Sequence, residues 1–157
     1  MSDHRVYMEQ AIAMARQNID SGDGGPFGAV IVREGQVVGR GRNGVTSSLD
    51  PTAHAEIVAI RDACANLKTF HLEDCDIYTS CEPCPMCLGA IYWARLRAIY
   101  YAANRQDAAR VNFSDEFIYE QIGVDPRFRV IPARHVEHPA ALEVFRLWQD
   151  KEDRIDY

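Results

Sequence analysis

Apolar residues recur at helical intervals near the start of the chain and then group into short blocks separated by turn residues. One set is spaced by 4, 3 and 4 residues, which predicts an amphipathic helix that the run SGDGG ends. Residues 27–33 predict a strand, and Glu34-Gly35 predicts a tight turn into a second strand over 37–42. The helical stripe consists of Met8, Ile12, Ala15 and Ile19.

The rest of the chain alternates between helical and strand patterns. Asp50-Pro51-Thr52 opens a helix that runs to about Leu67, with proline near its first position. Pro83-Cys84-Pro85 begins another helix. A hairpin followed by this alternation predicts an α/β sandwich with a mixed sheet, of five strands in all. The remaining predicted strands are 76–80, 97–102 and 128–131, and the remaining helices are 114–122 and 139–150.

Composition and charge exclude several classes of protein. The 157 residues are 47% hydrophobic and 25% charged, which fits one globular domain and excludes a disordered chain, a collagen or a coiled coil. The chain lacks an apolar run of ~18 residues, and its opening MSDHRVYMEQ lacks a signal-peptide layout, so we expect a cytoplasmic protein without a membrane partner. A net charge of −6 makes nucleic acid an unlikely partner, because nucleic-acid binders usually carry a basic surface.

The chain has five cysteines, three of them close together. An odd number without a signal peptide argues against a disulfide framework. Clustered cysteines in a reducing compartment more often bind metal or carry out redox chemistry. The five are Cys64, Cys75, Cys81, Cys84 and Cys87.

Two short segments carry the candidate chemistry, His54-Ala55-Glu56 and Pro83-Cys84-Pro85-Met86-Cys87. One imidazole and two thiolates are good zinc ligands, and three protein ligands leave the fourth tetrahedral position open for water. Glu56 is then a spare carboxylate that can move protons. His54 and Glu56 can converge only in the first turn of a helix, because residues two apart in mid-helix point to nearly opposite sides. The sequence therefore predicts two helix N-termini that meet at one metal ion.

The choice of cysteines has an alternative. Cys81-x-x-Cys84 has the same spacing as Cys84-x-x-Cys87, although the Pro-Cys dipeptide favours the second pair. A lone CxxC could also be a redox pair or half of a structural zinc site. A binding module with a closed structural zinc would need a fourth protein ligand and would have no use for Glu56.

The spacing H-x-E, then 26 residues, then P-C-x-x-C resembles the signature of the zinc nucleobase deaminases. Longer segments resemble the bacterial guanine deaminases of the cytidine deaminase superfamily: GGPFGAVIV, DPTAHAEI, YTSCEPCPMCLGAIYWAR and FSDEFIY. The resemblance implies a three-layer α/β/α fold with a central mixed five-stranded sheet, in one domain over 1–157. It also implies one Zn2+ per subunit, held by His54, Cys84 and Cys87, and conversion of guanine to xanthine and ammonia by a zinc-bound hydroxide with Glu56 as proton shuttle.

The same resemblance implies roles for residues around the substrate. Asn43 would hydrogen-bond the purine base, Phe27 would stack on it, and the backbone N–H groups around Ala55 would fix the ring carbonyl. Taken by itself, Asn43 could equally be a turn residue before Gly44, and Phe27 could be a core residue.

Three further positions follow from the resemblance. Asp115 would place a carboxylate near the substrate, and Trp93 would line the pocket, although each also has a plain reading as a helix-terminal charge or a core residue. The tail 151–157 would be exchanged between the subunits of a homodimer, with Tyr157 closing the pocket.

The two short motifs are also compatible with other substrates. The transfer RNA adenosine deaminases share both short motifs, so those motifs cannot separate a free base from an RNA loop. The negative net charge and the FSDEFIY segment favour the small base. Cytosine and an amino-triazine are lesser alternatives.

Overall fold

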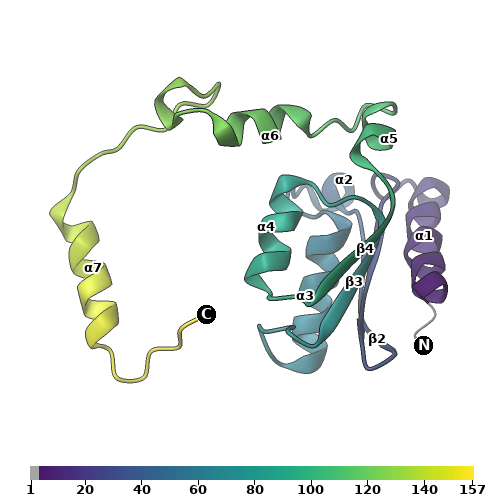
Figure 1. The fold of residues 1–157 in the computed structure, drawn as a ribbon, viewed down its shortest axis with the longest axis horizontal. Coiled ribbons are helices and arrows are strands. Elements are labelled where there is room, and N and C mark those ends of the chain that lie inside the picture. Colours follow the sequence, from purple (N-terminus) through teal and green to yellow (C-terminus); the bar gives the residue numbers. More distant parts are fainter. Residues whose placement is uncertain (1–3) are drawn as a thin grey trace. The chain divides into compact units, whose positions relative to one another are not determined.

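The computed structural model describes residues 4–157 and consists of two compact units, the first ending at Glu116 and the second running from Phe117 to Tyr157 (Figure 1). The sheet of the first unit has the strand order β2-β1-β3-β4. β1 is antiparallel to β2 and β3, whereas β3 and β4 are parallel, so the predicted mixed sheet is confirmed. The elements of this unit are α1 (His4–Ser21), β1 (Gly28–Arg33), β2 (Gln36–Arg42), α2 (Val45–Ser48), α3 (Ala55–Leu67), β3 (Cys75–Cys81), α4 (Pro85–Trp93), β4 (Ala98–Ala103) and α5 (Arg105–Ala109).

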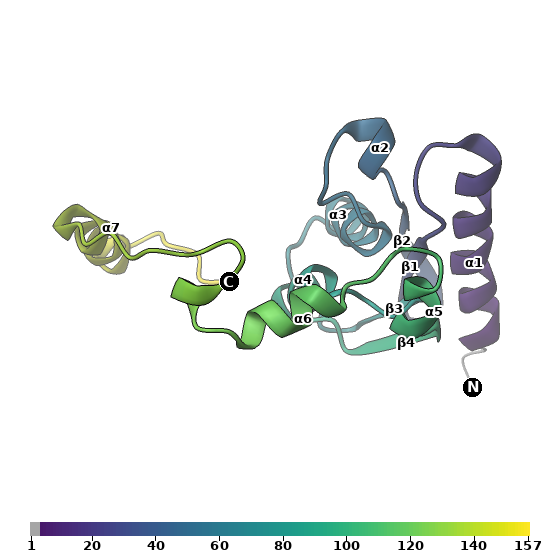
Figure 2. The same cartoon turned by 90° about the horizontal axis from the view of Figure 1, so that it is seen from above.

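Helices cover both faces of this sheet, as Figure 2 shows for α1 on one side and α3 and α4 on the other. β1 is buried on both faces, which explains why it reads as an unbroken apolar run. Ala29 and Ile31 belong to the core beneath α3 and α4, together with Ala59. Val30 and Val32 face the other way and form a second core cluster with Tyr78.

The first helix forms where the sequence predicts it, but with a different buried face. Ala11, Ala15 and Asn18 are its buried residues, whereas Ile12 and Ile19 of the predicted stripe are exposed. Small residues are needed on the buried face because α1 lies very close to β1. A Cβ at Gly28 would lie 2.3 Å from the carbonyl oxygen of Ala11.

The second unit contains most of α6 (Glu116–Gly123), a 3-10 helix η1 (Pro126–Phe128) and α7 (Pro139–Asp150). The predicted helix over 139–150 is confirmed. None of these elements has a buried residue. No helix among residues 4–157 has the length and hydrophobicity required to cross a membrane.

The prediction of a fifth strand at 128–131 is wrong, because the sheet in the described part of the chain has four strands. Pro126 at the first position and the Asp125 side chain, which accepts a bond from the Arg127 N–H at 3.0 Å, favour a helical turn there instead. The N–H of Val130 donates to Oε1 of Gln121 rather than to a neighbouring strand. The residues have strand propensity, but in the described part of the chain none of them pairs with a strand.

Candidate metal centre

Two helix N-termini bring the candidate metal ligands together. His54 is the N-cap residue of α3 and Cys84 is the N-cap residue of α4, both with extended backbone. The predicted helix from Pro51 therefore begins later than expected, at Ala55, and Glu56 is in its first turn. A Cβ at Gly41 of β2 would lie 2.0 Å from the Ala55 carbonyl oxygen, so only glycine lets this turn pack so closely against the sheet.

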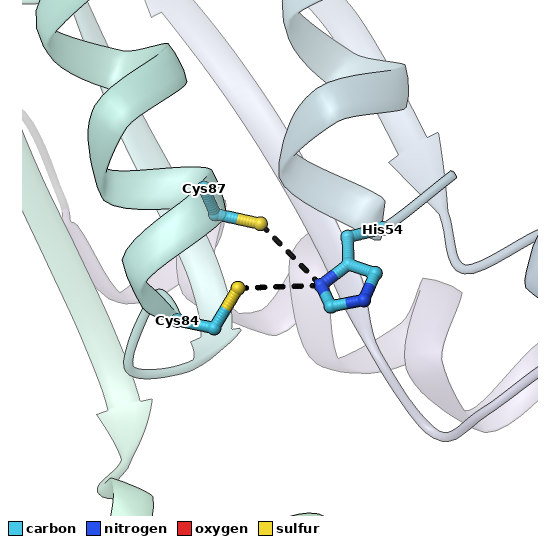
Figure 3. Close-up of side chains that lie close together, drawn as sticks. All are labelled: His54, Cys84 and Cys87. Carbon is cyan, nitrogen blue, oxygen red and sulfur yellow. Dashed lines mark hydrogen bonds between the residues drawn. The ribbon is translucent and has the colours of Figure 1, made fainter. Parts of the chain in front are cut away.

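The three donor atoms face one another, as Figure 3 shows. The Sγ atoms of Cys84 and Cys87 each lie 3.5 Å from Nδ1 of His54, and all three donor atoms lie within 4.8 Å of one another. With Zn–S near 2.3 Å and Zn–N near 2.0 Å, atoms bound to one tetrahedral zinc lie roughly 3.5 Å apart. The chemistry and the spacing of these residues therefore fit a zinc ion.

The environment of Cys84 favours its thiolate, which is the form that binds metal. Hydrogen bonding to Cys87, and more weakly to His54, lowers the pKa of Cys84 to about 4 despite its partial burial. The hydrogen bond with Cys84 and burial of the Cys87 sulfur raise the pKa of Cys87.

Glu56 is a buried carboxylate beside this donor set. Its side chain is 6% exposed, and its Oε2 accepts a hydrogen bond from the Cys87 Sγ at 3.4 Å. Burial, and to a smaller extent the negative charge of Cys84, raise the pKa of Glu56. A carboxyl group with a raised pKa can both accept and donate a proton near neutral pH.

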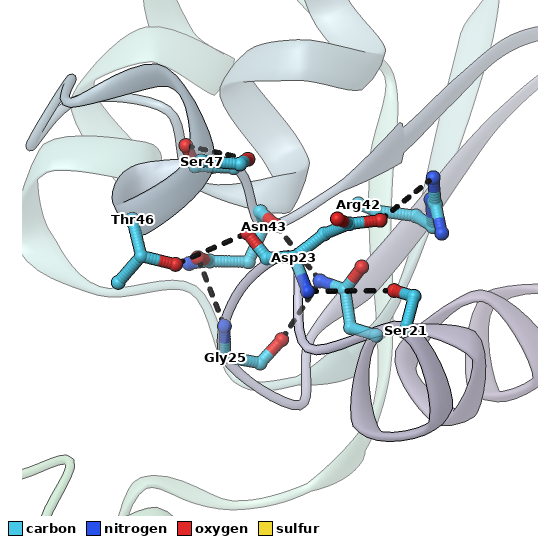
Figure 4. A network of polar contacts seen from close by, with 9 residues as sticks. Ser21, Asp23, Gly25, Arg42, Asn43, Thr46 and Ser47 are labelled. Atoms are coloured by element: carbon cyan, nitrogen blue, oxygen red, sulfur yellow. Dashed lines mark hydrogen bonds and ion pairs between the residues drawn. The ribbon is translucent and has the colours of Figure 1, made fainter.

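Asn43 and Phe27 lie at the facing ends of the β1–β2 hairpin. Asn43 is buried, and its Oδ1 accepts bonds from the backbone N–H groups of Gly25 and Val45, both at 3.2 Å (Figure 4). Because these bonds assign the oxygen, Nδ2 is the part of the amide left to donate. The Phe27 ring is half-buried and meets the Phe113 ring edge-on, with centroids 4.9 Å apart.

Asp115 is near enough to the metal donors to sense their charge. Burial first, and then the negative charge of Cys84, raise the pKa of Asp115, while Arg105 opposes the shift. Cys81 is close enough to Glu56 to sense its charge. Burial first, and then the negative charge of Glu56, raise the pKa of the Cys81 thiol to about 11. Its Sγ lies 3.7 Å from the carbonyl oxygen of Asn104 and is outside the three-residue donor set.

The protein family described as the cytidine and deoxycytidylate deaminase zinc-binding region matches residues 1–103. The chain belongs to this family of zinc-binding deaminases. It is 48% identical to the guanine deaminase of Bacillus subtilis over 155 residues, 99% of each chain. The crystal structure of the guanine deaminase from Bacillus subtilis superposes with a TM-score of 0.97, again over 99% of each chain. The tRNA-specific adenosine deaminase of Aquifex aeolicus is 38% identical over 97 residues, 62% of this chain and 64% of that protein.

Two further predicted pocket residues, Trp93 and Tyr157, have roles that stay predictions. Trp93 is the last residue of α4, at the opposite end from Cys84, and is 69% exposed in the single chain, so its role at the site stays a prediction. Tyr157 lies in the second unit, and its role at the site stays a prediction. Ala55, in contrast, is fully buried as the first residue of α3.

Sequence reasoning missed two residues next to the predicted pocket. Phe113 packs against Phe27. The sequence could have indicated this residue, because it is an aromatic residue two positions before Asp115. Asn18 is fully buried and donates to the backbone carbonyls of Gly25 and Asn43. The sequence indication for Asn18 was its position three residues after Ala15, which puts a polar residue on the face of α1 that otherwise buries alanine.

Proposed function

We propose that this deaminase hydrolyses guanine to xanthine and ammonia. The observation that carries the proposal is the buried Glu56 carboxylate, in contact with Cys87 of a donor set that fits zinc. The substrate follows from similarity to guanine deaminase over 99% of the chain. The similarity to the Aquifex aeolicus tRNA deaminase covers only 62%.

The metal would be held by His54, Cys84 and Cys87. Zinc bound to three protein ligands acts as a Lewis acid and lowers the pKa of water at its open position, which supplies a nucleophile at neutral pH. The positive ends of α3 and α4 point toward the donors and favour negative charge there.

Substrate positioning falls to residues around the hairpin and the first turn of α3. The Nδ2 group of Asn43 donates to an acceptor on the purine edge, and the Phe27 ring stacks against the base. The first N–H groups of a helix have no acceptor within it, so the N–H of Ala55 is available to the ring carbonyl. Asp115 accepts from an N–H group of the base.

Glu56 carries the protons in both halves of the reaction. It takes a proton from the attacking water and delivers it to N3 while the new bond forms between oxygen and C2. It then moves the second proton from the added hydroxyl to the amino group, the C2–N bond breaks, and ammonia leaves as the C2 carbonyl forms. The water supplies one oxygen and two protons, so guanine and water give xanthine and ammonia.

We also propose a homodimer in which the C-terminal segment is exchanged and Tyr157 closes the partner's pocket. Large apolar side chains with nothing to cover them within their own unit support this arrangement. Leu142, Phe145 and Trp148 recur every three residues along α7 and are all exposed. Exposed apolar surface on this scale marks an interaction site, and a second copy offers the same surface in return.

The test is ammonia release by the purified, zinc-loaded protein from guanine, adenine, cytosine, ammeline and a transfer RNA anticodon stem-loop. Xanthine formed from guanine, in preference to products from the other substrates, is the expected result. Inosine in the RNA without turnover of guanine would overturn the proposal and assign the protein to RNA editing. Zinc binding without any turnover would instead indicate a binding module.

A further inference from the structure

Asn18 is a polar residue where α1 otherwise buries alanine. Ala11, Ala15 and Asn18 form the buried face of this helix, and Asn18 is 0% exposed. Its Oδ1 is buried and has no hydrogen-bond partner among the described residues. An unpaired buried oxygen is unfavourable, and an alanine at this position would not have one. The advantage of the carboxamide must therefore come from its two N–H donors.

Both donors bind backbone carbonyls next to the proposed purine pocket. Nδ2 of Asn18 donates to the carbonyl oxygen of Gly25 at 2.9 Å and to that of Asn43 at 2.8 Å. One side chain of α1 therefore joins the loop before Phe27 to the end of β2.

The two joined segments also hold each other. The N–H of Asn43 donates to the Phe27 carbonyl at 3.1 Å, and the N–H of Gly25 donates to Oδ1 of Asn43. A Cβ at Gly24 would lie 2.1 Å from the Asn43 carbonyl oxygen, so the loop lies directly against this residue. Figure 4 shows Asn43 between Gly25 and the turn that carries Thr46.

We propose that Asn18 is a positioning residue for the purine pocket. It holds the carbonyls of Gly25 and Asn43 to α1 and thereby fixes the direction in which Nδ2 of Asn43 is offered to the base. This inference rests on the proposed function, because it takes Asn43 as the residue that binds the purine. Asn18 itself touches neither the substrate nor the metal donors.

The experiment compares Asn18→Ala with Asn66→Ala in the full-length, zinc-loaded protein. Asn66 is a matched control because its Nδ2 also donates to a backbone carbonyl, that of Val38 at 2.9 Å, but on an exposed part of α3. A loosened Asn43 weakens binding in the ground state and the transition state alike, so KM for guanine should rise about tenfold with kcat within about threefold. Zinc content should stay at one per chain, and Asn66→Ala should change neither constant.

A double-mutant cycle separates positioning from a general loss of packing. If Asn18 acts through Asn43, the variant Asn18→Ala/Asn43→Ala should have the KM of Asn43→Ala alone, within about twofold. Multiplied effects of the two substitutions, an unchanged KM in Asn18→Ala, or a fall in kcat alone would overturn the proposal.

If Asn18→Ala does not fold, Asn18→Ser keeps one short donor in a similar volume and enters the same cycle with the same criteria. If the wild-type protein does not turn over guanine, the proposed function fails and this inference fails with it. Wild-type turnover with an unchanged KM in the Asn18 variant refutes this inference alone.

Discussion

The Sγ of Cys87 lies 3.4 Å from Oε2 of Glu56. The same sulfur lies 3.5 Å from Nδ1 of His54, so the Cys87 thiol touches both the candidate metal donor of α3 and the carboxylate proposed to move protons. Cys87 is fully buried in the first turn of α4, and Glu56 is buried in the first turn of α3. The packing of these two turns therefore sets the distance between the candidate metal donors and the Glu56 carboxylate.

Replacement of Glu56 by glutamine should separate metal binding from catalysis. The amide keeps the size of the side chain but cannot accept the proton, so we expect guanine deamination to fall by about 10²–10⁴-fold. Zinc content, measured by atomic emission, should remain one per chain because the three donors are intact. Glu73→Gln is the control, since Glu73 is an exposed surface residue paired with Arg95 at 3.3 Å. Activity near wild type in Glu56→Gln would refute its assigned role.

Two serine variants should decide between the overlapping CxxC pairs. Cys84→Ser should lose zinc and activity together, because a neutral hydroxyl is a poor substitute for a thiolate ligand. Cys81→Ser should keep its zinc, since that sulfur lies outside the donor set. Zinc analysis after extensive dialysis measures both. Retention of zinc in Cys84→Ser with loss in Cys81→Ser would reverse the assignment.

Removal of Arg154–Tyr157 should lower kcat/KM for guanine by at least about tenfold if the tail closes the pocket. Zinc content should not change. Full activity of the shortened chain would rule out a lid function.

Complementation tests whether the tail is exchanged. A full-length Glu56→Gln chain and a shortened chain with intact Glu56 should each be nearly inactive. Co-expressed, they should regain activity, because the intact Glu56 site would receive the tail of its partner. Two shortened chains expressed together are the control. Mixed dimers that stay inactive would show that any lid acts within its own subunit.

Tyr78 should make the protein less stable in strong alkali. Burial raises the pKa of Tyr78 to about 12 from a usual value near 10, and its hydroxyl is bonded to Nδ1 of His4 at 2.7 Å. The folded state therefore keeps a proton that the unfolded state loses, so stability falls as pH rises from about 10 to about 12. Urea unfolding across this range should show a steeper decline in wild type than in Tyr78→Phe. Tyr92→Phe, at an exposed position, should decline as steeply as wild type.

Local signals in the sequence were sufficient to place the candidate metal donors at two helix starts. The requirement that His54 and Glu56 converge placed them at a helix start, and Pro85 placed Cys84 at another, as the structure has them. The hairpin turn was equally local, because Glu34 and Gly35 both adopt the positive φ that such a turn needs.

The incorrect predictions concern packing between elements. Residues 128–131 have strand propensity, but a strand also needs a partner, and propensity says nothing about that. The buried face of α1 was wrong because the close approach to Gly28 selects small residues over Ile12 and Ile19.

The order of the residues along the chain has a consequence for biogenesis. His54, Glu56, Cys84 and Cys87 all precede Glu116, so the metal donors are complete before the second unit has been synthesised. Folding during synthesis proceeds from the N-terminus, and a bound ion stabilises the unit that holds it. In the proposed homodimer, zinc loading would therefore precede chain pairing, and metal supply would be the first checkpoint in the maturation of the enzyme.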